Sequence, residues 1–266
     1  MKKKVILYNE NNKSRVRVQS TAMYLMSSLG YIEKADYAIF ADPGAEHPKT
    51  YKLLNDLKEW QACNNGIPLL VESKNLYKDL LKGTNSLGKK FVTIPAFSES
   101  KGMIMRQCTG EYKIWTVKDK IRELQGLKKR QRMKPCELWL GISIDEIQRM
   151  KESRMYNVKY IYPLIDKRIT RTDCKKFLEE KDFQNVIKSA CVFCPYQSDR
   201  QYKELKQNYP KEWKKVIKVD NAIRNNTKKG KEDKAYLHRT LKPINKVYLQ
   251  EDQEELFMCE EGYCGI

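Results

Sequence analysis

The sequence predicts an α/β protein with a doubly wound, mostly parallel sheet and a helical C-terminal part that contains cysteines. Two observations support this fold class. Short apolar runs alternate with helical patterns through the first half of the 266 residues. This alternation is typical of parallel sheets whose crossovers are helices. In the second half, helical patterns follow one another around a Cys-x-x-Cys pair.

Each element follows from its local pattern. Short continuous apolar runs are typical of strands buried on both faces, and they occur at 5–8, 37–41, 68–71 and 138–142. Apolar residues at helical spacing predict helices at 19–29, 51–60, 75–81, 117–124, 168–180, 199–207 and 212–224, before a Lys-rich loop at 225–233. We expect an α/β domain over 1–160, and a Cys-rich helical part with a basic loop and a cysteine tail over 161–266.

The charge predicts a polyanionic partner. The chain has 52 basic and 34 acidic residues, a net charge of +18, and a pI near 9.4. Such an excess favours a nucleic acid, a nucleotide or an anionic surface, although a merely solvated lysine face has the same composition. The basic cluster at 128–132 leaves the same two interpretations open: contact with phosphates, or a solvated loop.

The chain is expected to stay in the cytoplasm without membrane association. No stretch approaches the ~20 apolar residues of a membrane span. Lys2, Lys3 and Lys4 precede only a short apolar run without a cleavage pattern. In a reducing compartment the eight cysteines are better interpreted as thiols or metal ligands than as disulfides. With only two histidines, a metal site would be rich in thiolates.

A phosphate site is expected where the first strand leads into the first helix. In parallel sheets, ligands bind beyond the carboxyl ends of the strands, and a helix N-terminus favours an anion. Gln19, Ser20 and Thr21 stand where that helix is predicted to begin, and Arg15 and Arg17 add positive charge. The loop contains no glycine, so simple helix capping is the alternative.

Two further groups of residues are candidates for the same crevice. Asp42 ends the second predicted strand and Gly44 belongs to the turn that follows. Asp42 is either catalytic or shapes this turn. Arg149, Arg154 and Arg171 follow the strand at 138–142, and arginines at strand ends suit bidentate binding of phosphate or sulfate.

The cysteines predict a thiolate-bound metal. Cys191 and Cys194 have a spacing at which two thiolates bind one ion or cluster from a tight turn. Cys108 and Cys174 are the candidates for the two remaining ligands. The ligand set leaves iron–sulfur and zinc both open. The alternative is that the single cysteines are small buried apolar residues.

Two more cysteines lie at the end of the chain. Cys259 and Cys264 stand in the last eight residues, CEEGYCGI. A terminal cysteine is able to enter an active site as a nucleophile or a persulfide carrier. A disordered tail is the competing interpretation.

The motifs together resemble a known family. The stretches that match are VQSTAM (18–23), IFADPGAEHPKTY (39–51), RQCTGEYKI (106–114), LGISIDEIQRMKESR (140–154), YPLIDKRITRTDC (162–174), KSACVFCPYQSD (188–199) and CEEGYCGI (259–266). In this order they are similar to the phosphoadenosine phosphosulfate reductase-like branch of the adenine-nucleotide alpha-hydrolase (PP-loop) superfamily. The chain departs from the family's glycine-rich loop, because arginine stands at 15 and 17.

The resemblance implies an adenine nucleotide, ATP or an adenylyl sulfate, held in the domain 1–160 by the residues named above. Ser20 and Thr21 would bind phosphate with Asp42 nearby. The resemblance also implies a four-iron four-sulfur cluster on Cys108, Cys174, Cys191 and Cys194, with zinc as the fallback. Cys264 would be the catalytic cysteine.

The implied function is that of a sulfur-handling enzyme. The first expectation is ATP-dependent thiolation of a nucleic acid, tRNA or DNA, served by a sulfur or electron donor protein. One alternative is a sulfonucleotide reductase that releases sulfite through Cys264. The other is a non-catalytic module that binds nucleotide or nucleic acid, because the altered loop would then mark an inactive site.

Overall fold

The computed structural model describes residues 2–8, 16–100, 102–184, 186, 189–225 and 234–250, with the backbone alone for 16 and 17. The chain forms two compact units. The first comprises Met1–Asp42, Pro48–Ser73 and Lys113–Ser189. The second comprises Pro43–His47, Lys74–Tyr112 and Ala190–Ile266. Each unit is described here by itself.

The first unit is built on a five-stranded parallel sheet in the order β3-β2-β1-β6-β7. Its strands are β1 (Lys3–Leu7), β2 (Tyr37–Asp42), β3 (Leu69–Ser73), β6 (Cys136–Leu140) and β7 (Val158–Ile161). β2 and β3 are added on one side of β1, whereas β6 and β7 lie on the other. The strand order therefore reverses between β1 and β6, which makes their carboxyl ends the switch point of the sheet.

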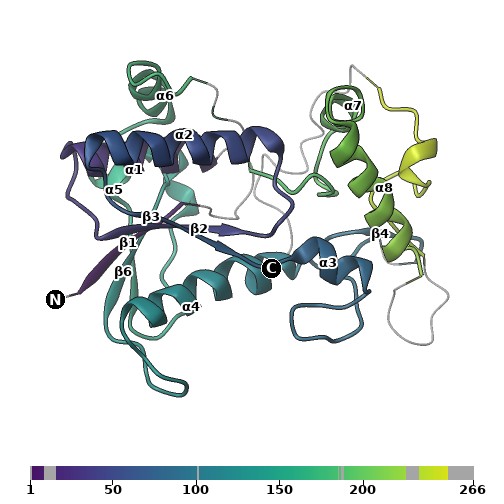
Figure 1. Cartoon of the computed structure of the whole chain (residues 1–266), viewed down its shortest axis with the longest axis horizontal. Helices are drawn as coiled ribbons and strands as arrows, with labels where there is room; N and C mark the ends of the chain where they lie inside the picture. Colours follow the sequence, from purple (N-terminus) through teal and green to yellow (C-terminus); the bar gives the residue numbers. More distant parts are fainter. Residues whose placement is uncertain are drawn as a thin grey trace. The chain divides into compact units, whose positions relative to one another are not determined.

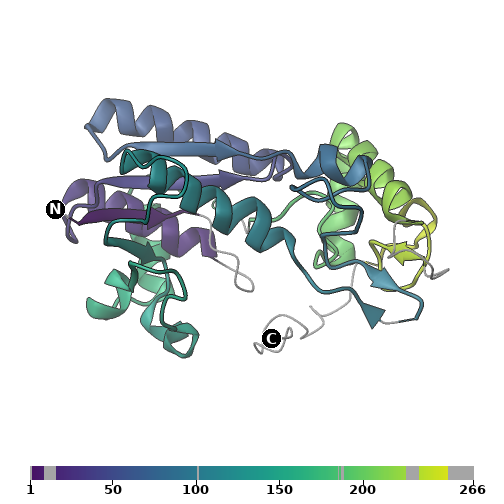
Figure 2. The ribbon, with the colours of Figure 1, turned by 90° about the horizontal axis from the view of Figure 1, so that it is seen from below.

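Helices cover both faces of this sheet. α1 (Val16–Leu29) and α2 (Pro48–Asn64) lie on one face and α4 (Trp115–Leu124) on the other (Figure 1). Figure 2, which views the chain from below, shows α4 in front of the strands. Side chains alternate accordingly: Ile6 faces the cluster under α1, and Val5 faces the cluster under α4. The predicted α/β fold with a parallel sheet flanked by helices is confirmed.

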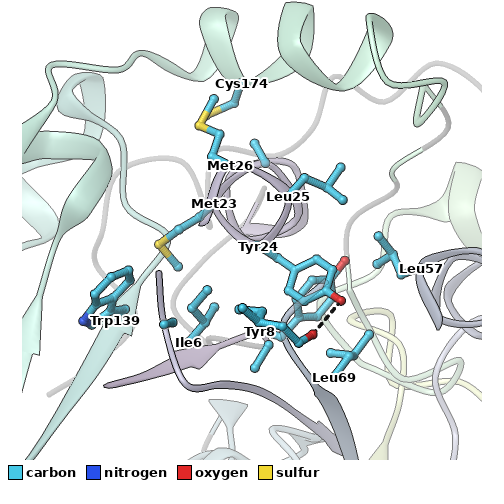
Figure 3. Packing of buried hydrophobic residues seen from close by; sticks show 14 of the residues in the cluster. Ile6, Tyr8, Met23, Tyr24, Leu25, Met26, Leu57, Leu69, Trp139 and Cys174 are labelled. Atoms are coloured by element: carbon cyan, nitrogen blue, oxygen red, sulfur yellow. Dashed lines mark hydrogen bonds between the residues drawn. The ribbon is translucent and has the colours of Figure 1, made fainter. Parts of the chain in front are cut away.

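The core on the α1 side is large and aromatic. Figure 3 shows Tyr24 and Met23 of α1 packed over Tyr8 and Trp139, all of them almost completely buried. Burial raises the pKa of the Tyr24 hydroxyl, which donates a hydrogen bond to the Ile67 carbonyl at 3.0 Å. Donating this bond satisfies a polar group that would otherwise be costly inside an apolar cluster.

Two helices that follow β7 complete the first unit. They are α5 (Pro163–Asp166) and α6 (Arg171–Glu179), and α6 packs against α1. The sequence predicted a helix from residue 168, but α6 begins at Arg171. Thr170 caps it, because its hydroxyl accepts from the Asp173 backbone N–H at 3.1 Å while the Asp173 carboxylate accepts from the Thr170 N–H at 2.9 Å.

The second unit combines helices with a small antiparallel sheet. Its strands have two residues each and lie in the order β5-β4-β8, with β4 at Phe97–Ser98, β5 at Gly102–Met103 and β8 at Ala235–Tyr236. Its helices are α3 (Leu76–Leu81), α7 (Asp199–Asn208), α8 (Pro210–Ile223) and a short 3₁₀ turn η3 (Ile244–Lys246). A π-helical turn, η1 (Gly110–Ile114), leads into α4. Strands this short contain no readable period, so the sequence did not predict them.

The division between the units differs from the one expected at residue 160. β4 pairs with β8, so the segment 74–112 folds together with the described residues of 190–250. In contrast, α5 and α6 contribute Leu164 and Phe177 to the core of the first unit. Of the predicted Lys-rich loop at 225–233, residues 226–233 lie outside the described residues. Within the described ranges, no helix is both long and apolar enough to cross a bilayer.

Candidate functional site

The carboxyl ends of β1 and β6 meet α1 at very close range. A Cβ atom placed on Gly141, which directly follows β6, would stand 2.7 Å from Ser20 Oγ and 2.9 Å from Ser20 N. Side-chain atoms do not pack that closely against backbone, so only glycine lets α1 approach the strand end in this way. At the switch point, α1 therefore packs directly against the residue that follows β6.

α1 begins earlier than the sequence predicted. Its first residue is Val16 rather than Gln19, so Gln19, Ser20 and Thr21 lie at or beyond the end of the first turn and are not N-cap residues. The N–H groups of its first four residues, Val16–Gln19, have no hydrogen-bond partner within the helix itself. The Thr21 hydroxyl instead shares a 2.6 Å hydrogen bond with the Tyr8 hydroxyl.

The Gln19 side chain joins three segments of the first unit. Its Nε2 donates to Ser143 Oγ at 2.8 Å and to Glu146 Oε2 at 3.0 Å. Its Oε1 accepts from Arg171 Nη1 at 3.4 Å. Ser143 precedes the 3₁₀ helix η2 (Ile144–Arg149). Gln19 thus positions α1, η2 and the start of α6, and its amide has no donor left for a ligand.

Two of the predicted phosphate-binding arginines belong to this network. Arg149 forms an ion pair with Glu146, and its side chain is largely buried. The backbone N–H of Arg171 donates to the Asp145 carboxylate at 3.0 Å. The structure thus brings Gln19, Arg149 and Arg171 together. Arg154 lies exposed in the segment between η2 and β7.

Ser20 differs from Gln19 and Thr21 in the hydrogen bonding of its side chain. Its side chain is fully buried, and Ser20 Oγ has no hydrogen-bond partner among the residues that the structure describes. A buried hydroxyl without a partner costs about 1–3 kcal/mol. Such an atom at a switch point is a place where the oxygen of a ligand or a bound water completes the hydrogen bonding.

The structure describes only part of the predicted phosphate loop. Arg15 lies outside the described residues, and only the helical backbone is described at Arg17. The role of both arginines therefore stays a prediction.

Asp42 belongs to the first unit, whereas Gly44 belongs to the second. Asp42 ends β2 and its carboxylate accepts hydrogen bonds from the Tyr51 hydroxyl at 3.0 Å and the Ser73 hydroxyl at 3.3 Å. Gly44 belongs to the second unit and has a φ of +76°, which glycine adopts without strain. These bonds hold Asp42 in place at the carboxyl end of the sheet, and a catalytic role for it stays a prediction.

The predicted metal ligands fall into two groups. Cys191 and Cys194 form a tight turn in the second unit, closed by a 2.9 Å bond from the Cys194 N–H to the Cys191 carbonyl. Gln197 Nε2 fixes this turn by donating to the Cys191 and Val192 carbonyls, both at 2.8 Å. Cys108 and Cys191 pack against the apolar core of the same unit.

Cys174 belongs to the first unit and lies inside its core. The side chain is fully buried beside Met26 of α1, as Figure 3 shows. Desolvation by burial raises the pKa of the Cys174 thiol to about 12, and the nearby carboxylate of Asp145 adds to the shift. A metal ligand must be a thiolate, and this environment favours the neutral thiol.

The four predicted ligands are divided between the two units, Cys174 in the first and the other three in the second. Among the described residues, no three His, Cys, Asp or Glu side chains converge in a way that could hold a metal ion. The turn at Cys191 and Cys194 has the spacing at which two thiolates bind one metal ion, whereas Cys174 suits an apolar core. A cluster on all four therefore stays a prediction, and no reaction step below depends on it. Cys264 lies outside the described residues.

The burial of Cys174 leads to a first testable prediction. In the native protein we expect iodoacetamide to label the exposed Cys63 and to leave Cys174 unmodified. The thiol of Cys174 is inaccessible and neutral, whereas alkylation needs an accessible thiolate. Mass spectrometry after short labelling measures both sites. Early labelling of Cys174 in folded protein would contradict its placement.

The same thiol makes stability depend on pH. Its folded-state pKa of about 12 lies above the ordinary thiol value of 9.0, so the folded state retains the proton longer than the unfolded state. Its contribution to the free energy of unfolding is complete below about pH 9 and is lost as the pH rises towards 12. Cys174→Ala removes this dependence, which urea titrations across this range would detect.

Three residues of the switch point were absent from the sequence-based prediction. Gly141, Ser143 and Glu146 lie in the segment LGISIDE. A glycine at the end of a buried strand was the available signal, since it indicates close approach of another backbone. The partners of Gln19 could not be inferred, because Ser143 lies 124 positions further along the chain.

In comparisons with known protein families, curated proteins and solved structures, the chain matches none.

Proposed function

We propose that the first unit binds an adenine nucleotide at the carboxyl ends of β1 and β6, and that the protein is a sulfur-handling enzyme. The enzyme would be similar to the phosphoadenosine phosphosulfate reductase-like branch of the PP-loop superfamily. The expected reaction is ATP-dependent thiolation of a nucleic acid.

One observation carries the nucleotide part of this proposal: Ser20 Oγ is buried and has no hydrogen-bond partner among the described residues, at the point where Gly141 lets α1 approach the end of β6. A phosphate oxygen is a suitable acceptor for that hydroxyl. The N–H groups in the first turn of α1 add donors and a favourable dipole. Hydrogen bonds from Gln19 to Ser143, Glu146 and Arg171 hold the first turn of α1 in place. The N–H groups of that turn therefore keep a fixed direction.

The chemistry follows from what adenylation achieves. An oxygen of the nucleic acid attacks the α-phosphate of ATP and pyrophosphate leaves, which turns a poor leaving oxygen into a good one. The terminal sulfur of a cysteine persulfide then attacks the activated atom and displaces AMP, since anionic sulfur is a strong nucleophile. A thiol of the donor protein cleaves the S–S bond, so that the terminal sulfur stays on the nucleic acid and the two thiols form a disulfide. Side chains of the first unit would bind and orient the nucleotide. We assign no residue of the described chain as the sulfur carrier.

A thiolate-bound metal centre in the second unit is a separate part of the proposal. It rests on the turn at Cys191 and Cys194. Anaerobic purification followed by metal analysis tests it. Iron with absorbance near 400 nm that is lost in Cys191→Ser supports an iron–sulfur cluster. Stoichiometric zinc supports a zinc site instead. If the protein contains neither iron nor zinc, the proposed metal centre is wrong.

Product analysis under anaerobic conditions tests the function. The protein is mixed with ATP, or with adenylyl sulfate and its 3′-phosphorylated form, each with and without bulk RNA and DNA. Pyrophosphate and AMP that depend on nucleic acid support thiolation. Release of sulfite from an adenylyl sulfate would indicate that the reaction is sulfonucleotide reduction and not thiolation. The sequence evidence for that reaction is the terminal Cys264. Absence of turnover together with salt-sensitive binding of nucleic acid would indicate a non-catalytic module.

A further inference from the structure

The loop between α4 and β6 is strongly basic. Its residues Lys128, Lys129, Arg130, Arg132 and Lys134 are all exposed, and 126–134 contains no acidic residue. We refer to these five residues as the basic loop. A run of like charges is usually a solvated face, so the charge alone does not indicate a binding surface.

Side chains of α4 hold the backbone of the basic loop by hydrogen bonds. Arg122 of α4 donates from Nη1 to the Gln131 carbonyl at 2.7 Å and from Nη2 to the Lys128 carbonyl at 2.9 Å. Gln125 exchanges two hydrogen bonds with the backbone of Lys134, at 2.9 and 3.0 Å. Because these bonds use the loop backbone, the basic side chains point outward from a fixed support. A pre-organised surface loses less entropy when a ligand binds.

An exposed aromatic ring lies beside the loop. Tyr156 is 67% exposed, and the Arg132 guanidinium lies 5.9 Å from its ring centroid. Asn157, the next residue, ties the two segments together: its Nδ2 donates to the Met133 carbonyl at 2.8 Å, and its own carbonyl accepts from the Cys136 N–H at 2.9 Å. The ring and the positive charges therefore form one surface.

We propose that the basic loop and Tyr156 bind single-stranded nucleic acid. The phosphates would pair with the basic side chains and an unpaired base would stack on Tyr156. Aromatic rings interleaved with basic residues are how proteins bind single strands, since every base offers a face for stacking. This inference rests on the proposed function, because it assigns a docking surface to the nucleic-acid substrate.

The surface is distinct from the nucleotide site. The basic loop precedes β6, and Gly141 follows it. A five-residue strand spans about 17 Å, so the surface lies at the opposite end of the sheet from Ser20. Substitutions in the basic loop are therefore expected to leave ATP binding unchanged. This separates failure of the present inference from failure of the proposed function.

Fluorescence anisotropy with a labelled RNA strand of about 12 nucleotides tests the proposal. The triple variant K129Q/R130Q/R132Q is expected to bind at least roughly tenfold more weakly than the wild type, and to lower the slope of log affinity against log salt by about 2. The matched control K211Q/K214Q/K218Q removes three exposed charges from α8. It is expected to change the affinity less than about threefold.

Substitution of the ring tests the stacking. Tyr156→Ser is expected to weaken binding of the single strand about tenfold and to leave binding of duplex DNA unchanged. Equal losses in the loop variant and the α8 control would overturn the proposal, because net charge would then explain them. Failure of the wild type to bind the single strand would overturn it as well. Loss of binding in the loop variant alone, with ATP affinity preserved, would support it.

Discussion

Gly141→Ala is expected to destabilise the first unit and to abolish nucleotide binding. The new Cβ would stand 2.7 Å from Ser20 Oγ, 2.9 Å from Ser20 N and 3.0 Å from Ser20 Cα. Two of these atoms are backbone, so rotation of a side chain cannot relieve the overlap and α1 must move. Overpacking of this kind costs about 1–3 kcal/mol. Urea unfolding followed by circular dichroism measures the loss.

Gly110→Ala is the matched control. A Cβ at Gly110 meets no atom within 4 Å, and Gly110 lies in the helical turn η1, where alanine is at least as favourable as glycine. Its free energy of unfolding should equal that of the wild type or slightly exceed it. If Gly141→Ala unfolds at the same urea concentration as Gly110→Ala, the close approach of α1 to β6 is incorrect.

Asp220→Ala is expected to have the largest effect in the second unit. The buried carboxylate of Asp220 on α8 accepts from the Leu237 N–H at 2.9 Å and from the Ile244 N–H at 3.1 Å, and it forms an ion pair with Arg224. Alanine leaves both donors and a largely buried guanidinium without this acceptor. Removing one partner of a buried ion pair costs about 3–5 kcal/mol.

Hydrogen exchange locates this loss. In Asp220→Ala the amides of 235–247 should exchange much faster than in the wild type, because Asp220 joins them to α8. Asp220→Asn retains one acceptor oxygen and should recover part of the protection. Asp56→Ala, which removes an exposed carboxylate from α2, should change the free energy of unfolding by less than about 0.5 kcal/mol. Unchanged exchange over 235–247 in Asp220→Ala would contradict this account of the second unit.

The sequence predicted the first unit well, since its strands are continuous apolar runs. Strands were expected at 5–8 and 37–41, and the structure has β1 at Lys3–Leu7 and β2 at Tyr37–Asp42. The edge strand β7 was not predicted. Its sequence VKYI places a lysine in the middle, so its apolar run is interrupted.

The site was predicted only in part, for a physical reason. Position after a strand is a local property, and it correctly placed Gln19 and Ser20 near the carboxyl end of β1. Partners across the sheet are not local, so the bond from Gln19 to Ser143 and the contact of Ser20 with Gly141 appear only in the folded chain. The burial of Cys174 is of the same kind, because it depends on α6 packing against α1.

Calorimetric titration with ATP measures whether Ser20 belongs to a nucleotide site. The wild type is expected to bind ATP, and Ser20→Ala is expected to weaken binding about tenfold or more, the value of a lost hydrogen bond to a charged oxygen. Stability without ATP should not fall, because the variant removes an unsatisfied hydroxyl. Thr93→Val, which removes another buried unsatisfied hydroxyl from the second unit, should leave ATP affinity unchanged. Equal affinity in the wild type and Ser20→Ala, or no binding by the wild type, would contradict the claim.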